Sequence, residues 1–236
     1  MTSLIKKLYE DGVRIDVREI RNHIWKTKGD IAAESIYQKA LKAEQAKKEN
    51  ASQIQQKLSV LFSHYKTDQL KNITSEELQS HINSKIGQTD GKQEGFKDYE
   101  LEQQRDFAIR FAWGHDHDFG DFFVQGMMRD RHLSLMANFW NEFDLDETAF
   151  KGKKVLDVGC WTGGTSLLLA KLGAEVTALE EVKKYANMAS FLVKSFGCDY
   201  KVKIESSSIY TIDYKKYMNQ FDVVYFPGVI YHLSDP

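Results

Sequence analysis

The sequence predicts an α/β protein in which a doubly wound parallel sheet follows a helical N-terminal region. Three observations support this fold class. Strand and helix patterns alternate after Lys153, which is typical of a parallel sheet with crossover helices. The only two prolines, Pro227 and Pro236, lie near the C-terminus, so nothing interrupts long helices upstream. Hydrophobic residues make up 42% of the 236 positions, which is enough for a packed core.

The composition indicates a globular protein without disulfides or membrane spans. Its two cysteines, Cys160 and Cys198, provide no disulfide framework and fit a reducing compartment. No apolar run reaches the roughly 18 residues that cross a bilayer, and the N-terminus lacks the pattern of a secretory signal. We therefore expect a cytoplasmic protein with no membrane partner.

Residues 1–97 are interpreted as a helical arm that ends in a linker. Apolar residues recur at helical spacing over 30–66, and Thr74 with Glu77 forms a capping box that opens a short helix. Three glycines within 83–96 predict the linker. The arm could join two copies of the chain as a coiled coil or contact RNA, although a solvated helix surface explains its charges as well.

Residues 98–152 form the second predicted region, a helical lead-in to the sheet. Apolar and aromatic spacing predicts one helix over 98–113 and another over 131–143. The loop between them is dense in His, Asp, Gly and aromatic residues. Such a mixture is typical of loops that build a functional site.

Four side chains of this loop are candidates for substrate contact. Arg129 or Arg131 could bind an acidic acceptor by a bidentate contact, and a helix-start salt bridge with Asp130 explains them equally well. His115 and His117 share one face if the segment is extended, an arrangement that can bind a divalent metal. Because no cluster of further ligands is evident, we expect these histidines to face substrate or to cap the site.

The third predicted region, 153–236, supplies the sheet. Strand patterns cover 153–158, 175–180, 200–205 and 221–226, and helix patterns cover 164–172 and 182–196. Gly173 and Gly197 follow the two helices as C-terminal stops.

A glycine-rich turn, Asp157-Val158-Gly159-Cys160-Trp161-Thr162-Gly163-Gly164, follows the first strand. A turn at this place binds nucleotide-like ligands at the switch point of a doubly wound sheet. Glu180 ends the second strand, where an acidic side chain can accept hydrogen bonds from both hydroxyls of a ribose. Trp161 stands where a dinucleotide site needs a small residue for the pyrophosphate, so a ligand without phosphate, such as S-adenosylmethionine, fits better.

The segments VLDVGCWTGG, VTALEE and FDVVYFPGVIYHLSDP resemble class I S-adenosylmethionine-dependent methyltransferases, which have a Rossmann-like sheet. Within that class, the G-V-I-Y-H stretch is similar to the branch that includes the tRNA wobble-uridine carboxymethyltransferases. The resemblance covers 153–236 and, more loosely, 99–152. It implies S-adenosylmethionine as cofactor and methyl transfer as the activity.

The resemblance also implies roles for individual residues. Asp157, Gly159 and Gly163 would hold the methionine part of the cofactor, Glu180 the ribose, and Ser208 with Ile209 the adenine. The full expected cofactor set is Asp157, Gly159, Cys160, Trp161, Gly163, Glu180, Ser208, Ile209 and Gly228. Two departures from the family pattern are Trp161, where many members have glycine, and the lack of an acidic residue in 206–209 to contact the adenine amine.

Residues Gly228 to His232 would line the floor that faces the transferred methyl group. Tyr231 and His232 follow the fourth strand, where a general base could reach an acceptor that must lose a proton. A structural hydrogen bond that caps the strand is the alternative role for His232.

We expect a small-molecule acceptor with an oxygen or carbon acceptor atom, since the Asp/Asn-Pro-Pro-aromatic signature of many amino-group methyltransferases is absent. Residues 61–150 carry 9 Lys and Arg against 17 Asp and Glu, a net charge of −8, which disfavours strong contacts with nucleic-acid phosphates. A nucleoside or tRNA acceptor is the alternative that the branch resemblance suggests. A non-enzymatic assembly protein with an incomplete cofactor pocket, associated through its helical arm as a homo-oligomer, is the second alternative.

The fold that this chain resembles has seven strands, and four strand patterns precede Pro236. We therefore expect a chain that lacks the C-terminal half of the domain. An uncovered apolar edge strand would then favour aggregation, low solubility and weak turnover.

Overall fold

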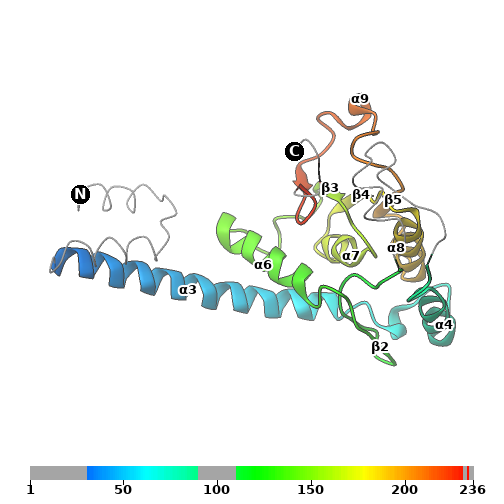
Figure 1. Cartoon of the computed structure of the whole chain (residues 1–236), viewed down its shortest axis with the longest axis horizontal. Coiled ribbons are helices and arrows are strands. Elements are labelled where there is room, and N and C mark those ends of the chain that lie inside the picture. The colour runs from blue at the N-terminus through cyan, green and yellow to red at the C-terminus, as the bar shows by residue number, and fades with distance from the viewer. Residues whose placement is uncertain (1–30, 90–109, 231–232, 234–236) are drawn as a thin grey trace. The chain divides into compact units, whose positions relative to one another are not determined.

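The computed structural model describes residues 31–89, 110–230 and 233 (Figure 1). The chain divides into two compact units, Met1–Gln53 and Ile54–Pro236. The first 30 residues of the predicted arm and the predicted catalytic pair Tyr231 and His232 lie outside the described residues.

Helix α3 runs from Ile31 to Phe62 and confirms the helical pattern over 30–66, which the sequence left open as one long helix or a helix pair, as a single helix. Its last turns belong to the second unit, where Leu58 and Phe62 are buried in the main hydrophobic core. The end of α3 is therefore part of the scaffold beneath the sheet region.

A short 3-10 turn, η1 (Thr67–Gln69), and helix α4 (Ser75–Lys85) follow α3. The Thr74 hydroxyl accepts the amide of Glu77, and the Glu77 carboxylate accepts the amide of Thr74. The predicted capping box is confirmed, because both reciprocal hydrogen bonds are present.

The sheet of the second unit has four parallel strands in the order β5-β4-β3-β6. They are β3 (Lys154–Val158), β4 (Glu175–Leu179), β5 (Val202–Glu205) and β6 (Val223–Tyr225). The chain passes outward from β3 to β5 and then returns to the other side of β3. The doubly wound parallel fold is confirmed, and its switch point lies between β3 and β6.

Helices α6 (Arg131–Phe143), α7 (Gly164–Lys171) and α8 (Lys183–Ser195) cover one face of this sheet (Figure 1). The strands alternate between the two faces, so every second side chain joins the core beneath these helices. The other face carries a smaller cluster beside the short helix α9 (Tyr214–Tyr217). That cluster is built on Leu156, Val158 and Leu179.

The helix predicted over 98–113 is wrong at its C-terminal end, and the part before Arg110 lies outside the described residues. Arg110 forms an antiparallel bridge with Thr89, and the Phe111 amide donates to the carbonyl of Gln88. The backbone at this point is paired with the segment after α4, so it cannot make helical bonds within itself.

The loop predicted between 113 and 131 contains a two-stranded antiparallel ribbon, β1 (His117–Asp118) and β2 (Phe123–Val124). Phe119, between the two strands, is fully buried and stacks on the His117 ring at 3.7 Å between ring centroids. The ribbon fixes the loop against the core and leads into α6.

No helix among the described residues is long and apolar enough to cross a membrane. Strand β6 lies at one edge of the described sheet, and its Val224 side chain is 59% exposed. The expectation that the chain lacks the C-terminal half of the domain stays a prediction.

Replacing Leu58 with Ala should lower the free energy of unfolding by about 2–5 kcal/mol, because it leaves a cavity in the core beneath the sheet. The control Val60→Ala, on the same helix and 72% exposed, should change it by less than about 0.5 kcal/mol. Urea denaturation followed by circular dichroism measures both. Equal effects would mean that the end of α3 does not pack on the core.

Candidate functional site

A cavity of about 440 Å³ lies at the carboxyl ends of all four parallel strands. One side of its wall comes from the strand ends: Asp157, Gly159, Trp161, Glu180, Val182, Ser207, Ile209, Pro227, Gly228 and Val229. The other side comes from the lead-in and the first turns of α6: His115, Met128, Arg131, His132 and Leu135. The cavity therefore occupies the switch point of the sheet, where doubly wound folds bind ligands.

The turn after β3 depends on three residues with left-handed backbone, Gly159, Trp161 and Gly163, with φ of 77°, 52° and 87°. Glycine adopts this conformation without a Cβ clash. A Cβ at Gly163 would lie 3.2 Å from the Cβ of Ala189, so this glycine also lets α7 approach α8 closely. A Cβ at Gly159 would collide with Val229, which comes from the segment after β6.

Trp161 adopts the left-handed conformation although it has a side chain, at a cost on the order of 1–2 kcal/mol. Its amide donates to Oε2 of Glu180 at 2.8 Å, and its indole lies against the backbone of Gly114 and near the His115 ring. Strain of this kind persists where surrounding contacts fix it, often at functional sites. The indole thus helps to wall the cavity between the turn and the lead-in.

Glu180 is the buried carboxylate that joins the ends of β3 and β4. Its Oε2 accepts the Trp161 amide, and its Oε1 accepts the Val182 amide at 2.9 Å. Burial raises the pKa of Glu180 to about 7, although the two amide bonds act in the opposite direction. Each carboxylate oxygen can accept a second hydrogen bond, so both remain able to bind hydroxyl groups of a ligand.

Asp157, the penultimate residue of β3, supplies a second buried carboxyl group. Its Oδ2 accepts the Ser166 hydroxyl at 2.6 Å, which fixes the side chain against α7. Burial raises the pKa of Asp157 to about 6, and the Ser166 bond opposes that shift. A cationic ligand group beside Asp157 would favour its ionised form.

Two histidines stand on the opposite wall. The ring centroids of His115 and His132 lie 4.4 Å apart. Burial lowers the pKa of His115 to about 4 and that of His132 well below its ordinary value, so both rings are neutral near pH 7. Nδ1 of His115 and both ring nitrogens of His132 are buried without a hydrogen-bond partner.

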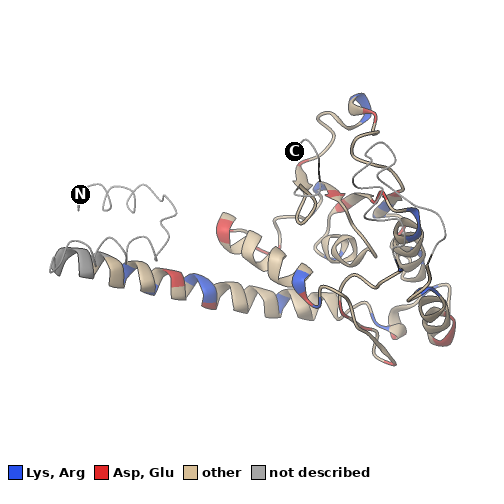
Figure 2. Cartoon of the chain, in the orientation of Figure 1, with Lys and Arg blue, Asp and Glu red and all other residues tan. Residues whose placement is uncertain are grey.

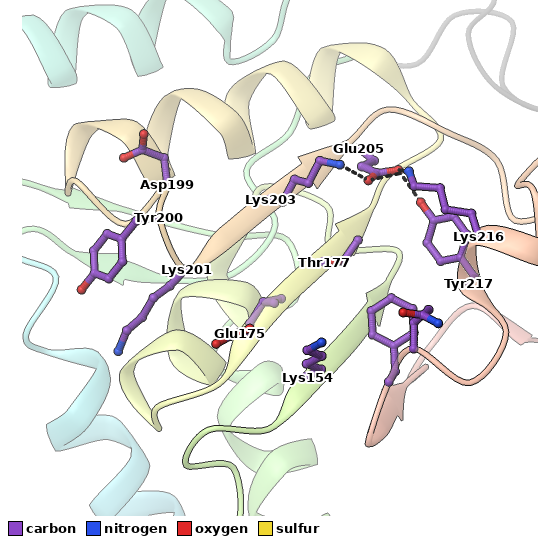
Figure 3. A pocket seen from close by; sticks show the side chains of 13 residues that line it. Lys154, Glu175, Thr177, Asp199, Tyr200, Lys201, Lys203, Glu205, Lys216 and Tyr217 are labelled. Carbon is purple, nitrogen blue, oxygen red and sulfur yellow. Dashed lines mark hydrogen bonds and ion pairs between the residues drawn. The ribbon is translucent and has the colours of Figure 1, made fainter.

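A second hollow, of about 460 Å³, lies on the face of the sheet beside α9 (Figure 3). Figure 3 shows the Glu205 carboxylate bound by Lys203, Lys216 and Tyr217. Burial alone would raise the pKa of Glu205, but these three partners lower it to about 2. The other two carboxylates that line this hollow belong to the exposed residues Glu175 and Asp199. The cavity at the strand ends, whose carboxyl groups are buried, is therefore the better candidate for ligand binding.

Eight of the predicted site residues line the cavity, and five described ones do not. Those that line it are Asp157, Gly159, Trp161, Glu180, Ile209, Gly228, His115 and Arg131. Those that do not are Cys160, Gly163, Ser208, Arg129 and His117. The Cys160 thiol is buried, which raises its pKa, and the Ser208 hydroxyl accepts the Tyr210 amide while the neighbouring Ser207 lines the cavity.

His117 and Arg129 do not take the substrate-facing positions that the sequence predicts. His117 is 2% exposed, and its Nε2 hydrogen-bonds the carbonyl of Tyr65 at 2.8 Å. It therefore packs in the core, whereas His115 lines the cavity. Among the described residues, no three His, Cys, Asp or Glu side chains are grouped as metal ligands.

Residues that line the cavity but were not predicted from the sequence include His132, Leu135 and Ser207. The first two were open to prediction, because Leu135 lies four residues after Arg131 and three after His132 on the predicted helix, so all three can face one site. Ser207 carried no comparable signal.

Comparison with known proteins gives a family match for part of the chain. Residues 156–236 match the family model described as a methyltransferase domain. A maize phosphoethanolamine N-methyltransferase 1 is 38% identical over 86 residues, and a mitochondrial ubiquinone biosynthesis O-methyltransferase from Schizosaccharomyces pombe is 32% identical over 120 residues. These alignments cover 36% and 47% of this chain, but only 16% and 40% of the two relatives.

Among solved structures, a Plasmodium falciparum protein described as a protein-L-isoaspartate O-methyltransferase, in complex with S-adenosyl-L-homocysteine, is 20% identical. The match covers 46% of this chain and 52% of that chain, with a TM-score of 0.33. The family model and the curated relatives support a methyltransferase domain in 156–236.

Asp157→Asn should stabilise the protein progressively, relative to wild type, as pH rises from 4 to 8. A carboxyl whose pKa is higher in the folded state stabilises that state at low pH and loses this contribution as pH rises toward its folded pKa, here about 6. The variant lacks that loss, so at pH 8 it should gain about 1–3 kcal/mol relative to its difference at pH 4.

Subtracting the wild-type curve removes the contribution of the buried histidines, whose lowered pKa values give stability the opposite pH dependence. Urea denaturation at each pH provides the data, with exposed Asp199→Asn as the control that should parallel wild type. A difference between Asp157→Asn and wild type that is constant with pH would contradict the assignment.

Proposed function

We propose that this chain binds S-adenosylmethionine in the cavity at the strand ends and transfers its methyl group to a small acceptor. The observation that carries the proposal is the pair of buried carboxyl groups, Asp157 and Glu180. They end neighbouring strands at the switch point and keep free acceptor positions. The family match over 156–236 supports the same cofactor.

In this proposal, Glu180 accepts hydrogen bonds from the two ribose hydroxyls through oxygens that the amides of Trp161 and Val182 hold in place. Asp157 and the backbone of Gly159 hold the amino end of the methionine part. Ser207 and Ile209, after β5, flank the adenine. Ser207 thus takes the role that the sequence predicts for its neighbour Ser208.

When bound, the cofactor supplies an electrophilic methyl group on a sulfonium. The residues of this chain then align the acceptor with that carbon and exclude water, which is the main requirement of an in-line displacement. The role of Tyr231 or His232 as a general base stays a prediction, since both residues lie outside the described residues. A base is needed only if the acceptor must lose a proton.

The small acceptor is favoured by the names of the two curated relatives, one an O-methyltransferase of ubiquinone biosynthesis and the other acting on phosphoethanolamine. The acceptor atom of this chain stays a prediction of oxygen or carbon. The tRNA alternative, the association of copies through the N-terminal arm and the cytoplasmic location likewise stay predictions.

Glu180→Ala should weaken the binding of S-adenosylhomocysteine by about 50-fold or more, because charge-assisted hydrogen bonds contribute about 1.5–3 kcal/mol each. Glu175→Ala, at the exposed start of the same strand, is the matched control and should bind as wild type does. Isothermal titration calorimetry measures the affinities.

Circular dichroism checks that the Glu180 variant is folded, and Glu180→Asp, which keeps the charge, should recover part of the affinity. The proposal fails if wild type does not bind S-adenosylhomocysteine, or if a folded Glu180→Ala variant binds it equally well.

A further inference from the structure

The wall of the cavity opposite the carboxyl groups contains a single basic residue. Arg131 is the only Lys or Arg among the described residues that line the cavity, whose other charged members are Asp157, Glu180 and Glu181. A single cation on one wall of an otherwise acidic cavity makes the electrostatic potential at that wall more positive, which favours an anionic ligand group there.

The position of Arg131 is not explained by the stability of the fold. No hydrogen bond or ion pair joins its side chain to a described residue, and the carboxylate of the adjacent Asp130 accepts the Gln55 amide at 2.7 Å instead. Arg131 is also the first residue of α6, where a positive charge opposes the helix dipole. The helix-start salt bridge with Asp130, one of the two sequence interpretations, is therefore absent.

Two uncharged imidazoles, those of His115 and His132, line the same cavity as Arg131. His132 is 2% exposed with both ring nitrogens unpartnered, and Nδ1 of His115 is also buried without a partner. Buried polar groups without partners are rare in folded proteins, and each calls for a ligand or water to satisfy it. Because burial lowers both pKa values, each neutral ring keeps one N–H that can donate a hydrogen bond near pH 7.

We infer that Arg131, His115 and His132, together with the positive end of α6, form a subsite for a carboxylate or phosphate group. A guanidinium binds either group through two parallel N–H···O bonds, and neutral imidazoles add donors without adding charge. The inference rests on the proposed function, which offers two sources for the anion. One is the carboxylate of the methionine part of the cofactor, and the other is an acidic group on the methyl acceptor.

The test compares Arg131→Met with the matched control Arg129→Met, which removes an exposed arginine two residues away that does not line the cavity. In the first arm, calorimetry measures the affinity of each protein for S-adenosylhomocysteine and for its decarboxylated analogue. In the second arm, each protein saturated with S-adenosylhomocysteine is titrated with inorganic phosphate and with acetate at constant ionic strength.

If the cofactor supplies the anion, wild type and Arg129→Met should prefer S-adenosylhomocysteine to the decarboxylated analogue by about 10- to 100-fold, and Arg131→Met should lose that preference. If the acceptor supplies it, the two cofactor analogues should bind alike. Phosphate or acetate should then bind wild type and Arg129→Met at least about 10-fold more tightly than Arg131→Met. Arg131→Lys should be intermediate in either case, since lysine offers charge without the bidentate geometry.

The inference is overturned if neither arm distinguishes Arg131→Met from Arg129→Met. Thermal unfolding provides the structural control: loss of a cation from the N-terminus of α6 should leave the melting temperature unchanged or slightly raised. Failure of wild type to bind S-adenosylhomocysteine would contradict the proposed function instead, and the phosphate and acetate titrations of the free proteins would then decide the subsite alone.

Discussion

The contact on which the site depends is the carboxylate of Glu180, which accepts the amides of Trp161 and Val182. The Trp161 bond connects the turn after β3 to the segment after β4, and it helps to hold Trp161 in a left-handed conformation that its side chain disfavours. The Val182 bond fixes the Glu180 side chain at the start of α8. The bonds also offset part of the cost of burying the carboxylate, whose pKa is nevertheless raised to about 7. One group thus fixes the backbone of the turn and still presents acceptor oxygens to the cavity.

The acidic and basic side chains that line the cavity come from different structural elements. The parallel strands contribute Asp157 and Glu180 at their carboxyl ends, whereas α6 and the lead-in contribute Arg131 and the neutral rings of His115 and His132. Figure 2 shows how the acidic and basic residues are distributed over the elements. A ligand with a cationic group, hydroxyl groups and an anionic group suits this division. In the hollow beside α9, by contrast, the Glu205 carboxylate is paired with Lys203 and Lys216.

The sequence predicts the sheet region well because its elements are periodic and bounded by glycine. All four strands and both helices after Lys153 appear within one or two residues of their expected limits, and Asp157, Gly159 and Glu180 line the cavity as expected. Sequence reasoning fails where tertiary contacts determine which way a side chain points. The Asp116 carboxylate accepts the Gly126 amide just before β1. His115 lines the cavity and His117 is buried in the core, although their spacing in an extended segment predicts one shared face.

A crystal structure of the chain with S-adenosylhomocysteine would test the proposed cofactor site most directly. We expect ribose hydroxyls on the two oxygens of Glu180, the amino group of the ligand near Asp157 and the sulfur above the turn at Gly159. A ligand bound in the hollow beside α9, or in the cavity with its ribose away from Glu180, would contradict it.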